Sequence, residues 1–340
     1  MTQFRSSLSA LLFLSASSVY AQAAIEIDLP ANSIGYSSQT GLLYATIASA
    51  AGLPYGNSLI EISPADGTIT RSVFVGSEPG PLAISPDAPV AYAGLNGAAA
   101  VCPVDLATMT AGTSFTLGPS TFLGLPYPGQ IAVMPGSPNT VAVSRIAPGY
   151  SPDYQGVAIF DSGVMRPTVD NTFSGADAIA FGSDPSTLYG YDQEDSAYTL
   201  YTFSITSAGI SVENSADSII TGFNVNIIAE GSTIFATSGA AVNGSSYELL
   251  GTYEQSGGPV VLDDTSNTVM FADNNFNGNI VSVFDRTLFL PLYSLSITAA
   301  QGSPISAAGC GPRCMAIVYD SNQIFIARDI GDEIFANGFE

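Results

Sequence analysis

A short unit of strand, turn and strand recurs seven times along this 340-residue chain, and the repetition limits the folds that it can adopt. The clearest copies are PLAISPDAPVAYAG from Pro81, QIAVMPGSPNTVAVS from Gln130, AIAFGSDPSTLYGY from Ala178 and PVVLDDTSNTVMFADNNFNGNIVSVFD from Pro259. Fainter copies begin at Ser33, Asn226 and Met315. A strand-rich unit repeated in this way is typical of a β-propeller, in which each repeat forms one blade of a closed ring.

The spacing of the units predicts the number of blades. We align their second strands on Tyr44, Tyr92, Val141, Tyr189, Phe235, Phe271 and Phe325, at intervals of 36 to 54 residues. Most intervals agree with the roughly 40–50 residues of a four-stranded blade. We therefore predict an all-β fold with one seven-bladed β-propeller over residues 24–330; six and eight blades are the alternatives.

Two irregularities qualify this pattern. The 36-residue interval after Phe235 predicts that the fifth blade has a very short or missing outer strand, with Tyr247–Glu254 as its third strand. The last unit lacks an outer strand after Phe325. We predict that Ile25–Leu29 supplies it, because a strand from the N-terminus would close the ring and remove an exposed edge.

Two segments carry a resemblance to a known family. Phe271–Asp285 (FADNNFNGNIVSVFD) resembles the repeat core of the YVTN-type, lactonase-like seven-bladed propellers found in many exported bacterial proteins. Gly76–Pro79 and Leu82–Asp87 are similar to the joint between their repeats, with Ala88 replacing a usual Gly. The resemblance covers most of residues 24–330 and is strong in two or three units. It implies a fold and no particular reaction, because one fold hosts many functions.

Residues 1–23 have the layout of a secretory signal peptide. Arg5 supplies the positive charge, Leu8–Leu14 the apolar stretch, and Ala21–Ala23 a small-x-small cleavage motif, with a cut after Ala21 as the alternative. The segment predicts a secreted, periplasmic or cell-surface protein, although it could also be retained as an anchor. No later stretch approaches 18 apolar residues, so we expect no membrane span after signal removal. Residues 331–340 are expected to form a C-terminal tail.

Charge and composition exclude several functions. The chain has 29 acidic residues, seven Arg, no Lys and no His, for a net charge of −22. Nucleic acids and anionic membranes require clustered cations, so neither is an expected partner. Without His, Ser–His–Asp and Cys–His mechanisms and His-based zinc sites are excluded. The acidity is typical of a soluble secreted protein, with cation binding or life in high salt as alternatives.

The three cysteines have different expected roles. Cys310 and Cys314 flank a Gly-Pro-Arg turn and could form a local disulfide in an oxidising compartment. Their spacing differs by one residue from a redox CxxC motif. Cys102 lies in an apolar strand, where a buried, inert thiol is expected.

The sequence contains one partial calcium-binding pattern. Asp273, Asn275 and Asn277, followed by Gly278, match the first half of a calcium loop, D-x-N-x-N-G. The acidic twelfth residue of that loop is missing, and the alternating IVSVF that follows favours an ordinary hairpin. We therefore predict no metal and no cofactor, with these three residues as weak candidates. The loop that contains Asp192, Glu194 and Asp195 offers a second place where blades could share a cation.

Two functions remain open. The first is a non-enzymatic binding or scaffold protein that uses the loops between second and third strands to hold an unknown protein or small ligand. Candidate contact residues in these loops are Tyr55, Tyr150, Tyr154, Asp192, Asp195 and Asp273. The second is a lactonase-like hydrolase or lyase with carboxylates and Arg at the mouth of the central channel. The lack of His and the small number of Arg favour the first, and we assign no catalytic residue.

Overall fold

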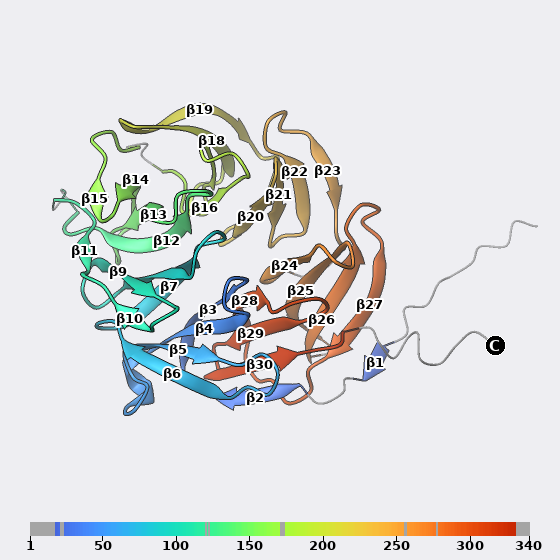
Figure 1. The fold of residues 1–340 in the computed structure, drawn as a ribbon. Helices are drawn as coiled ribbons and strands as arrows, with labels where there is room; N and C mark the ends of the chain where they lie inside the picture. Colours follow the sequence, from blue (N-terminus) through green and yellow to red (C-terminus); the bar gives the residue numbers. More distant parts are fainter. Residues whose placement is uncertain are drawn as a thin grey trace, which may run out of the picture.

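The computed structural model describes residues 18–20, 24–119, 121, 123–170, 174–254, 257–276 and 278–330. These residues form seven β-sheets, which surround a common centre as the blades of a propeller (Figure 1). The predicted all-β, seven-bladed fold is confirmed. Within the described residues, the three-residue 3-10 helix η1 (Ser49–Ala51) is the one helix, and no helix there is long enough to cross a membrane.

The first four blades follow the chain in order. Blade one contains β3 (Ala31–Ser37), β4 (Leu42–Ile47), β5 (Ser58–Ile62) and β6 (Ile69–Phe74). Blade two contains β7 (Pro79–Ile84), β8 (Val90–Leu95), β9 (Ala100–Asp105), β10 (Thr110–Ala111) and β11 (Phe115–Thr116). Blade three contains β12 (Tyr127–Val133), β13 (Thr140–Ile146), β14 (Tyr154–Asp161) and β15 (Val164–Met165). Blade four contains β16 (Ala178–Phe181), β17 (Thr187–Tyr191), β18 (Thr199–Thr206) and β19 (Gly209–Asp217).

The last three blades include the two N-terminal strands. Blade five contains β20 (Ile227–Glu230), β21 (Thr233–Ala236), β22 (Ala240–Asn243) and β23 (Leu249–Thr252). Blade six contains β24 (Val260–Asp263), β25 (Thr268–Asn275), β26 (Gly278–Asp285) and β27 (Pro291–Ser296), and β1 (Ser18–Tyr20) pairs parallel to β27. Blade seven contains β28 (Pro304–Gly309), β29 (Met315–Tyr319), β30 (Gln323–Ala327) and β2 (Ile25–Asp28).

Two strand assignments made from the sequence are wrong by one position. Phe325 lies on β30, the third strand of its blade, and the second strand is β29. In blade five the third strand is β22, whereas the predicted segment Tyr247–Glu254 contains the outer strand β23. That outer strand is only four residues long, which agrees with the short interval in the sequence. The first error arises because second and third strands are both apolar on two sides and differ little in pattern. The second arises because Leu249 and Leu250 make the outer strand β23 apolar in sequence, although both side chains are exposed.

The ring is closed by the N-terminal strand, as predicted. β2 pairs antiparallel with β30, with Ile25 opposite Ile326 and Ile27 opposite Ile324. Ile25, Ile27 and Leu29 pack against the core between blades seven and one. The first and last parts of the propeller are therefore held in one sheet, and the edge of β30 is covered.

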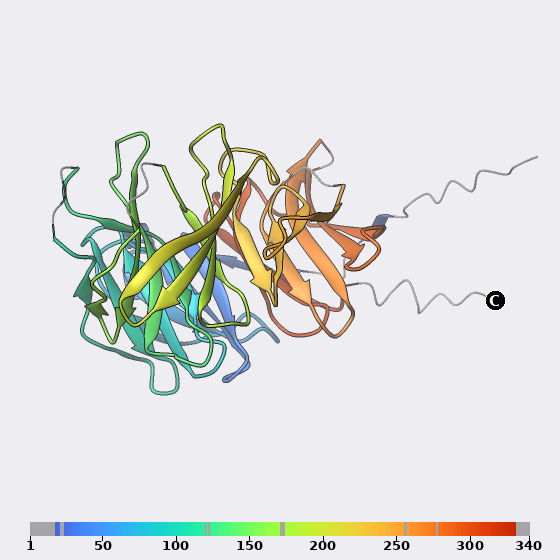
Figure 2. The same cartoon turned by 90° about the horizontal axis from the view of Figure 1, so that it is seen from above.

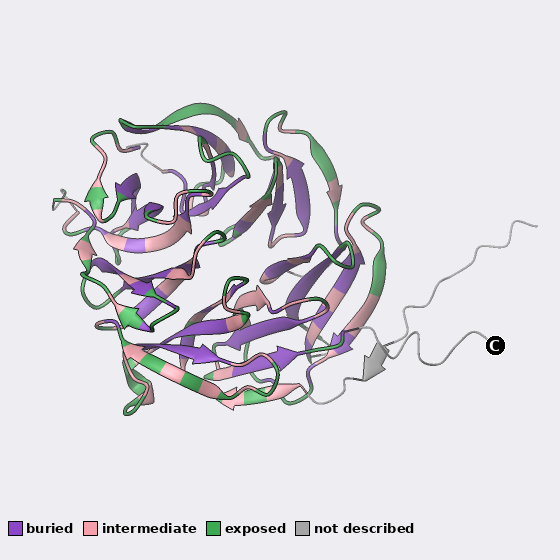
Figure 3. Ribbon diagram, in the orientation of Figure 1, coloured by how far each residue is buried: buried purple, intermediate pink, exposed green. Residues whose placement is uncertain are grey.

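The hydrophobic core consists of seven clusters, each between two neighbouring blades. Strand β29 shows the rule: Met315, Ile317 and Tyr319 pack toward blade six, while Ala316 and Val318 pack toward blade one. The middle strands are accordingly buried on both faces, and the outer strands β6 and β2 alternate between half-buried and exposed residues (Figure 3). Every blade thus depends on both neighbours for burial.

A buried carboxylate connects three strands of blade one. Glu61 of β5 is 2% exposed. Its oxygens accept hydrogen bonds from the Tyr44 hydroxyl at 3.0 Å, the Thr70 hydroxyl at 2.5 Å and Arg71 Nε at 2.8 Å. Burial opposes the charged form, but these hydrogen bonds outweigh it and lower the pKa of Glu61. Arg71 also donates to the Ala107 carbonyl of blade two at 2.9 Å, so the ion pair bridges two blades.

Removal of β2 should destabilise the propeller strongly. Deleting residues 24–30 would expose the edge of β30 and the apolar surface that Ile25 and Ile27 cover. We expect the free energy of unfolding to fall by about 3–5 kcal/mol, from lost burial and lost strand pairing. Chemical denaturation followed by circular dichroism measures the change.

A pair of double variants separates burial from the mere presence of the strand. Ile25→Ser with Ile27→Ser removes the inward side chains, whereas Glu26→Ser with Asp28→Ser changes the exposed side of the same strand. The first pair should reproduce much of the loss, and the second should have little effect. Equal stability of the two variants would contradict the closure of the ring by β2.

The Glu61 carboxylate should contribute stability that depends on pH. Glu61→Gln should lower the free energy of unfolding by about 1–3 kcal/mol at neutral pH, because hydrogen bonds to a charged group are lost. A carboxylate with a lowered pKa stabilises the fold above its usual pKa of 4.5 and loses this effect as the pH falls through the lowered value. The difference in free energy of unfolding between Glu61→Gln and the parent protein should therefore shrink as the pH falls through the lowered pKa of Glu61. The exposed Glu248→Gln change serves as the control, and a difference that persists undiminished in acid would exclude the effect.

Candidate functional site

One face of the ring carries the longer connections, and we call it the loop face. In an antiparallel four-stranded blade, the connection from second to third strand and the connection to the next blade emerge on the same side. Figure 2 shows this face at the top, with loops of blades three and four (green to yellow) standing above the strands. The connections β4–β5, β13–β14, β17–β18 and β25–β26, which the sequence analysis selected for recognition, all lie here.

The central channel opens on the loop face as a cavity of about 1150 Å³. Asn96, Gln130 and Asn226 contribute amides to its wall. Gln130 Oε1 accepts a hydrogen bond from the Ile179 backbone at 2.9 Å, which fixes that amide between blades three and four. Among the described residues that line the cavity, Glu78 is the one carboxylate and no Arg is present. The acid-plus-Arg arrangement that a hydrolase or lyase alternative requires is therefore not favoured.

Large apolar side chains are exposed on the loop face. Leu53 is 97% exposed on the β4–β5 connection, and Tyr150 is 53% exposed on the β13–β14 connection. Phe276 is fully exposed between β25 and β26. Leu125 and Phe223, on the connections that lead into blades three and five, are also exposed. Exposed apolar side chains gathered on one face, beside a polar cavity, are typical of a contact surface.

The three predicted tyrosines differ in accessibility. Tyr150 is exposed, and Tyr55 is half-buried against the core between blades seven and one. Tyr154 differs from the expectation because it is 5% exposed and packs in the core between blades three and four. Its hydroxyl donates to Asp170 Oδ2 at 2.5 Å, and burial raises the pKa of Tyr154 well above its usual value. Tyr154 therefore stabilises the packing beneath the loop face and does not itself form part of the exposed surface.

The predicted acidic residues are not all at the surface either. Asp195 is exposed, but Asp192 is buried, and its Oδ1 accepts hydrogen bonds from the Glu194 and Asp195 backbone at 3.0 and 2.9 Å. This is the local bonding that Asp favours in turns. Asp273 is also buried, in a strand rather than in a loop.

The partial calcium pattern falls on a β-hairpin. Asp273 pairs with Ile280 and Asn275 with Gly278, so the ladder between β25 and β26 continues almost to the turn. Asn277 lies outside the described residues. The structure thus has a hairpin over most of the pattern, which is the arrangement that the alternating residues of β26 favoured.

A different set of carboxylates comes together between blades three and four. Asp153 precedes β14, Asp177 directly precedes the inner strand β16, and Glu194 lies on the β17–β18 connection. One carboxylate oxygen from each lies within 4.8 Å of the others. Glu194 Oε2 also accepts the Asp153 backbone N–H at 2.7 Å, which joins the two loops. None of the three forms a salt bridge with another described residue.

Burial and mutual repulsion affect the protonation of this cluster. Burial, together with the charges of Glu194, Asp192 and Asp153, raises the pKa of Asp177 to about 7. Burial and the charge of Glu194 raise the pKa of Asp153 to about 6. Asp177 Oδ2 accepts the Gln193 backbone N–H at 3.1 Å, but its Oδ1 has no hydrogen-bond donor in the described part of the chain.

Sequence reasoning missed Asp153 and Asp177 as members of one site. Of the three residues, only Glu194 lies in the Asp192–Asp195 loop, where the sequence offers a cation shared between blades. The available signal was an acidic residue directly before an apolar inner strand, in Asp177-Ala178-Ile179. The signal was insufficient because the three residues are far apart in the chain and meet only through packing of two blades.

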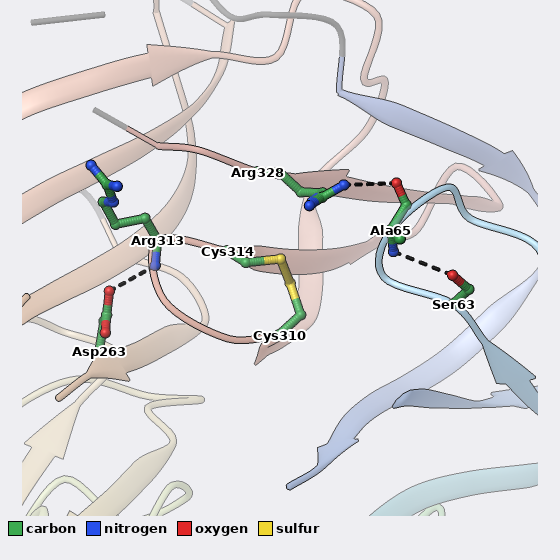
Figure 4. Close-up of a disulfide and its surroundings, with 7 residues drawn as sticks. All are labelled: Ser63, Ala65, Asp263, Cys310, Arg313, Cys314 and Arg328. Atoms are coloured by element: carbon green, nitrogen blue, oxygen red, sulfur yellow. Dashed lines mark hydrogen bonds between the residues drawn. A yellow bond between two sulfur atoms is a disulfide. The ribbon is translucent and has the colours of Figure 1, made fainter. Parts of the chain in front are cut away.

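The disulfide lies on the opposite face, in the connection between β28 and β29 (Figure 4). Cys310 and Cys314 are bonded with a Cα–Cα distance of 5.0 Å and pack in the core between blades seven and one. Within the same turn, the Arg313 backbone N–H donates to Asp263 Oδ2 of blade six at 2.8 Å. Cys102 is free and buried in blade two, and burial raises the pKa of its thiol.

The architecture defines the class of protein as a seven-bladed β-propeller, and comparisons with known structures agree. No family model and no curated protein matches the chain. A chain of hydrazine synthase from Kuenenia stuttgartiensis is similar, with 14% identity, a TM-score of 0.67 and coverage of 89% of this chain and 97% of that chain. The β-propeller domain of Cps50 (Swd1) from Myceliophteria thermophila has 12% identity, a TM-score of 0.66 and coverage of 87% and 96%. At such identities the likeness establishes the fold alone.

The disulfide should be found in the purified protein, with Cys102 reduced. Peptide mapping without reductant is expected to yield a Cys310–Cys314 cross-link, and alkylation after unfolding should label Cys102. Cys310→Ser with Cys314→Ser should lower the free energy of unfolding by about 2 kcal/mol, because the closed loop is short. Cys102→Ala serves as the control variant, and it is a better control than Cys102→Ser because alanine keeps this buried position apolar. A cross-link that involves Cys102 would contradict the arrangement.

Proposed function

We propose that the chain is an exported, non-catalytic binding protein that holds a protein partner on its loop face. The observation that carries the proposal is the exposure of Leu53, Tyr150 and Phe276 on three loops of that face. Aromatic and large apolar side chains supply most of the binding free energy in protein interfaces. A small ligand in the channel mouth is the alternative.

The ring supports such a role physically. Each loop is anchored at both ends in a blade whose two faces are packed, so the loops are presented on a rigid scaffold. The net charge of −22 opposes nucleic acids and anionic membranes and suits a partner with a neutral or basic surface. Export, through residues 1–23, and membership of the YVTN-type group belong to the same proposal.

A capture experiment tests the loop face. The purified protein is immobilised and exposed to the culture supernatant or periplasmic extract of the organism that makes it. Replacing Leu53, Tyr150 and Phe276 by Ser should reduce recovery of the specific partner at least tenfold, because each is a candidate energetic centre of the interface.

A matched variant controls for the loss of surface hydrophobicity. Replacing Val164, Leu249 and Leu290 by Ser removes exposed apolar side chains from the outer strand of blade three, the outer strand of blade five and the turn before β27, all away from the loop face. Recovery should then equal that of the parent protein. Equal recovery by the loop-face variant, or lactone hydrolysis that depends on Glu78, would overturn the proposal.

A further inference from the structure

We propose that Asp153, Asp177 and Glu194 form a binding site for a calcium ion that bridges blades three and four. This site is separate from the proposed contact surface and does not depend on it. The ligands come from three different segments: the loop before β14, the residue before β16 and the β17–β18 connection.

The geometry of the oxygens suits one ion. Ca²⁺ binds oxygens at about 2.3–2.6 Å, so two ligands of the same ion are at most about 4.6–5.2 Å apart. The three carboxylate oxygens lie within 4.8 Å of one another, which meets this condition without rearrangement. Asp153 and Glu194 are partly exposed, so an ion can enter from solvent, while Asp177 forms the buried end of the site.

Two buried oxygens supply the second observation. Asp177 is 8% exposed, and its Oδ1 has no hydrogen-bond donor among the described residues. The neighbouring Asp192 is 1% exposed, and its Oδ2 likewise lacks a donor there. Buried polar atoms are normally paired, and a buried charge needs a cation or a set of donors. A bound cation would satisfy Asp177 and offset the repulsion among the surrounding carboxylates.

The donor set distinguishes calcium from other metals. The cluster offers only oxygen ligands, and the chain contains no His, so soft or borderline metals such as Zn²⁺ lack their usual partners. Mg²⁺ requires an octahedron with ligands at about 2.0–2.1 Å, and it holds its water tightly. Carboxylates from three separate segments, two of them partly exposed to solvent, fit the larger and more adaptable Ca²⁺ shell.

Calorimetric titration of the full mature chain tests the site. After treatment with EDTA and its removal, titration with CaCl₂ should show one site per chain, with a dissociation constant of about 10⁻⁵–10⁻³ M. Saturating Ca²⁺ should raise the midpoint of thermal unfolding by roughly 3–6 °C, because the ion binds only the folded protein. MgCl₂ should bind at least about tenfold more weakly.

Variants locate the ion. Asp177→Asn and Glu194→Gln should each weaken Ca²⁺ binding at least about thirtyfold and abolish the thermal shift, because each removes one charged ligand. Asp28→Asn and Glu248→Gln change exposed acids elsewhere and should bind as the parent protein does. Circular dichroism verifies folding; if Asp177→Asn fails to fold, the partly exposed Glu194→Gln decides the outcome.

Three results would overturn the proposal. They are a parent protein with no saturable site at millimolar Ca²⁺, cluster variants that bind as the parent does, and equal affinity for Mg²⁺. The last would reject calcium as the resident ion, and the first two would reject the site itself.

Discussion

Face-to-face packing of neighbouring blades is the constraint on which the rest of this structure depends. Each of the seven apolar clusters lies between two blades, so no blade has a core of its own. A linear array built this way would leave one apolar face exposed at each end. The ring removes both ends, and the pairing of β2 with β30 fastens the place where the chain would otherwise open. The Cys310–Cys314 bond and Ile25 and Ile27 belong to that same closing interface.

The same packing separates structure from function in space. Apolar burial specifies the middle strands on both faces and leaves the connections free to vary. The loop face can therefore carry exposed Leu53, Tyr150 and Phe276 while the strands beneath remain uniform. It also brings together acids from adjacent blades. Asp177 directly precedes the inner strand β16 of blade four, and Asp153 lies in a loop of blade three. The two residues are neighbours only because those blades pack against each other.

Particular elements show where sequence reasoning succeeds. The lone apolar strand Ile25–Leu29 was placed correctly because it had no partner nearby in the chain and the last repeat lacked one. The prediction for Phe325 is wrong because a second and a third strand have the same apolar pattern when both faces are buried. The prediction for Tyr247–Glu254 is wrong because the outer strand there carries Leu249 and Leu250, which are apolar but exposed. Tyr154 was expected at the surface, yet an amphipathic side chain can turn its ring inward when its hydroxyl finds a buried acceptor such as Asp170.

The sequence by itself determined the blade repeat, the closing strand, and the exclusion of His-dependent chemistry, because these are properties of local pattern and composition. The tertiary structure alone decided which loops meet, which side chains among them are exposed, and which carboxylates share a site. The alternation of side chains along a strand determines which residues lie on each of its two faces. It contains no information on which residues of a neighbouring blade contact a given loop. The grouping of Asp153, Asp177 and Glu194 depends on how two twisted sheets pack, and packing acts between residues that are distant in the chain.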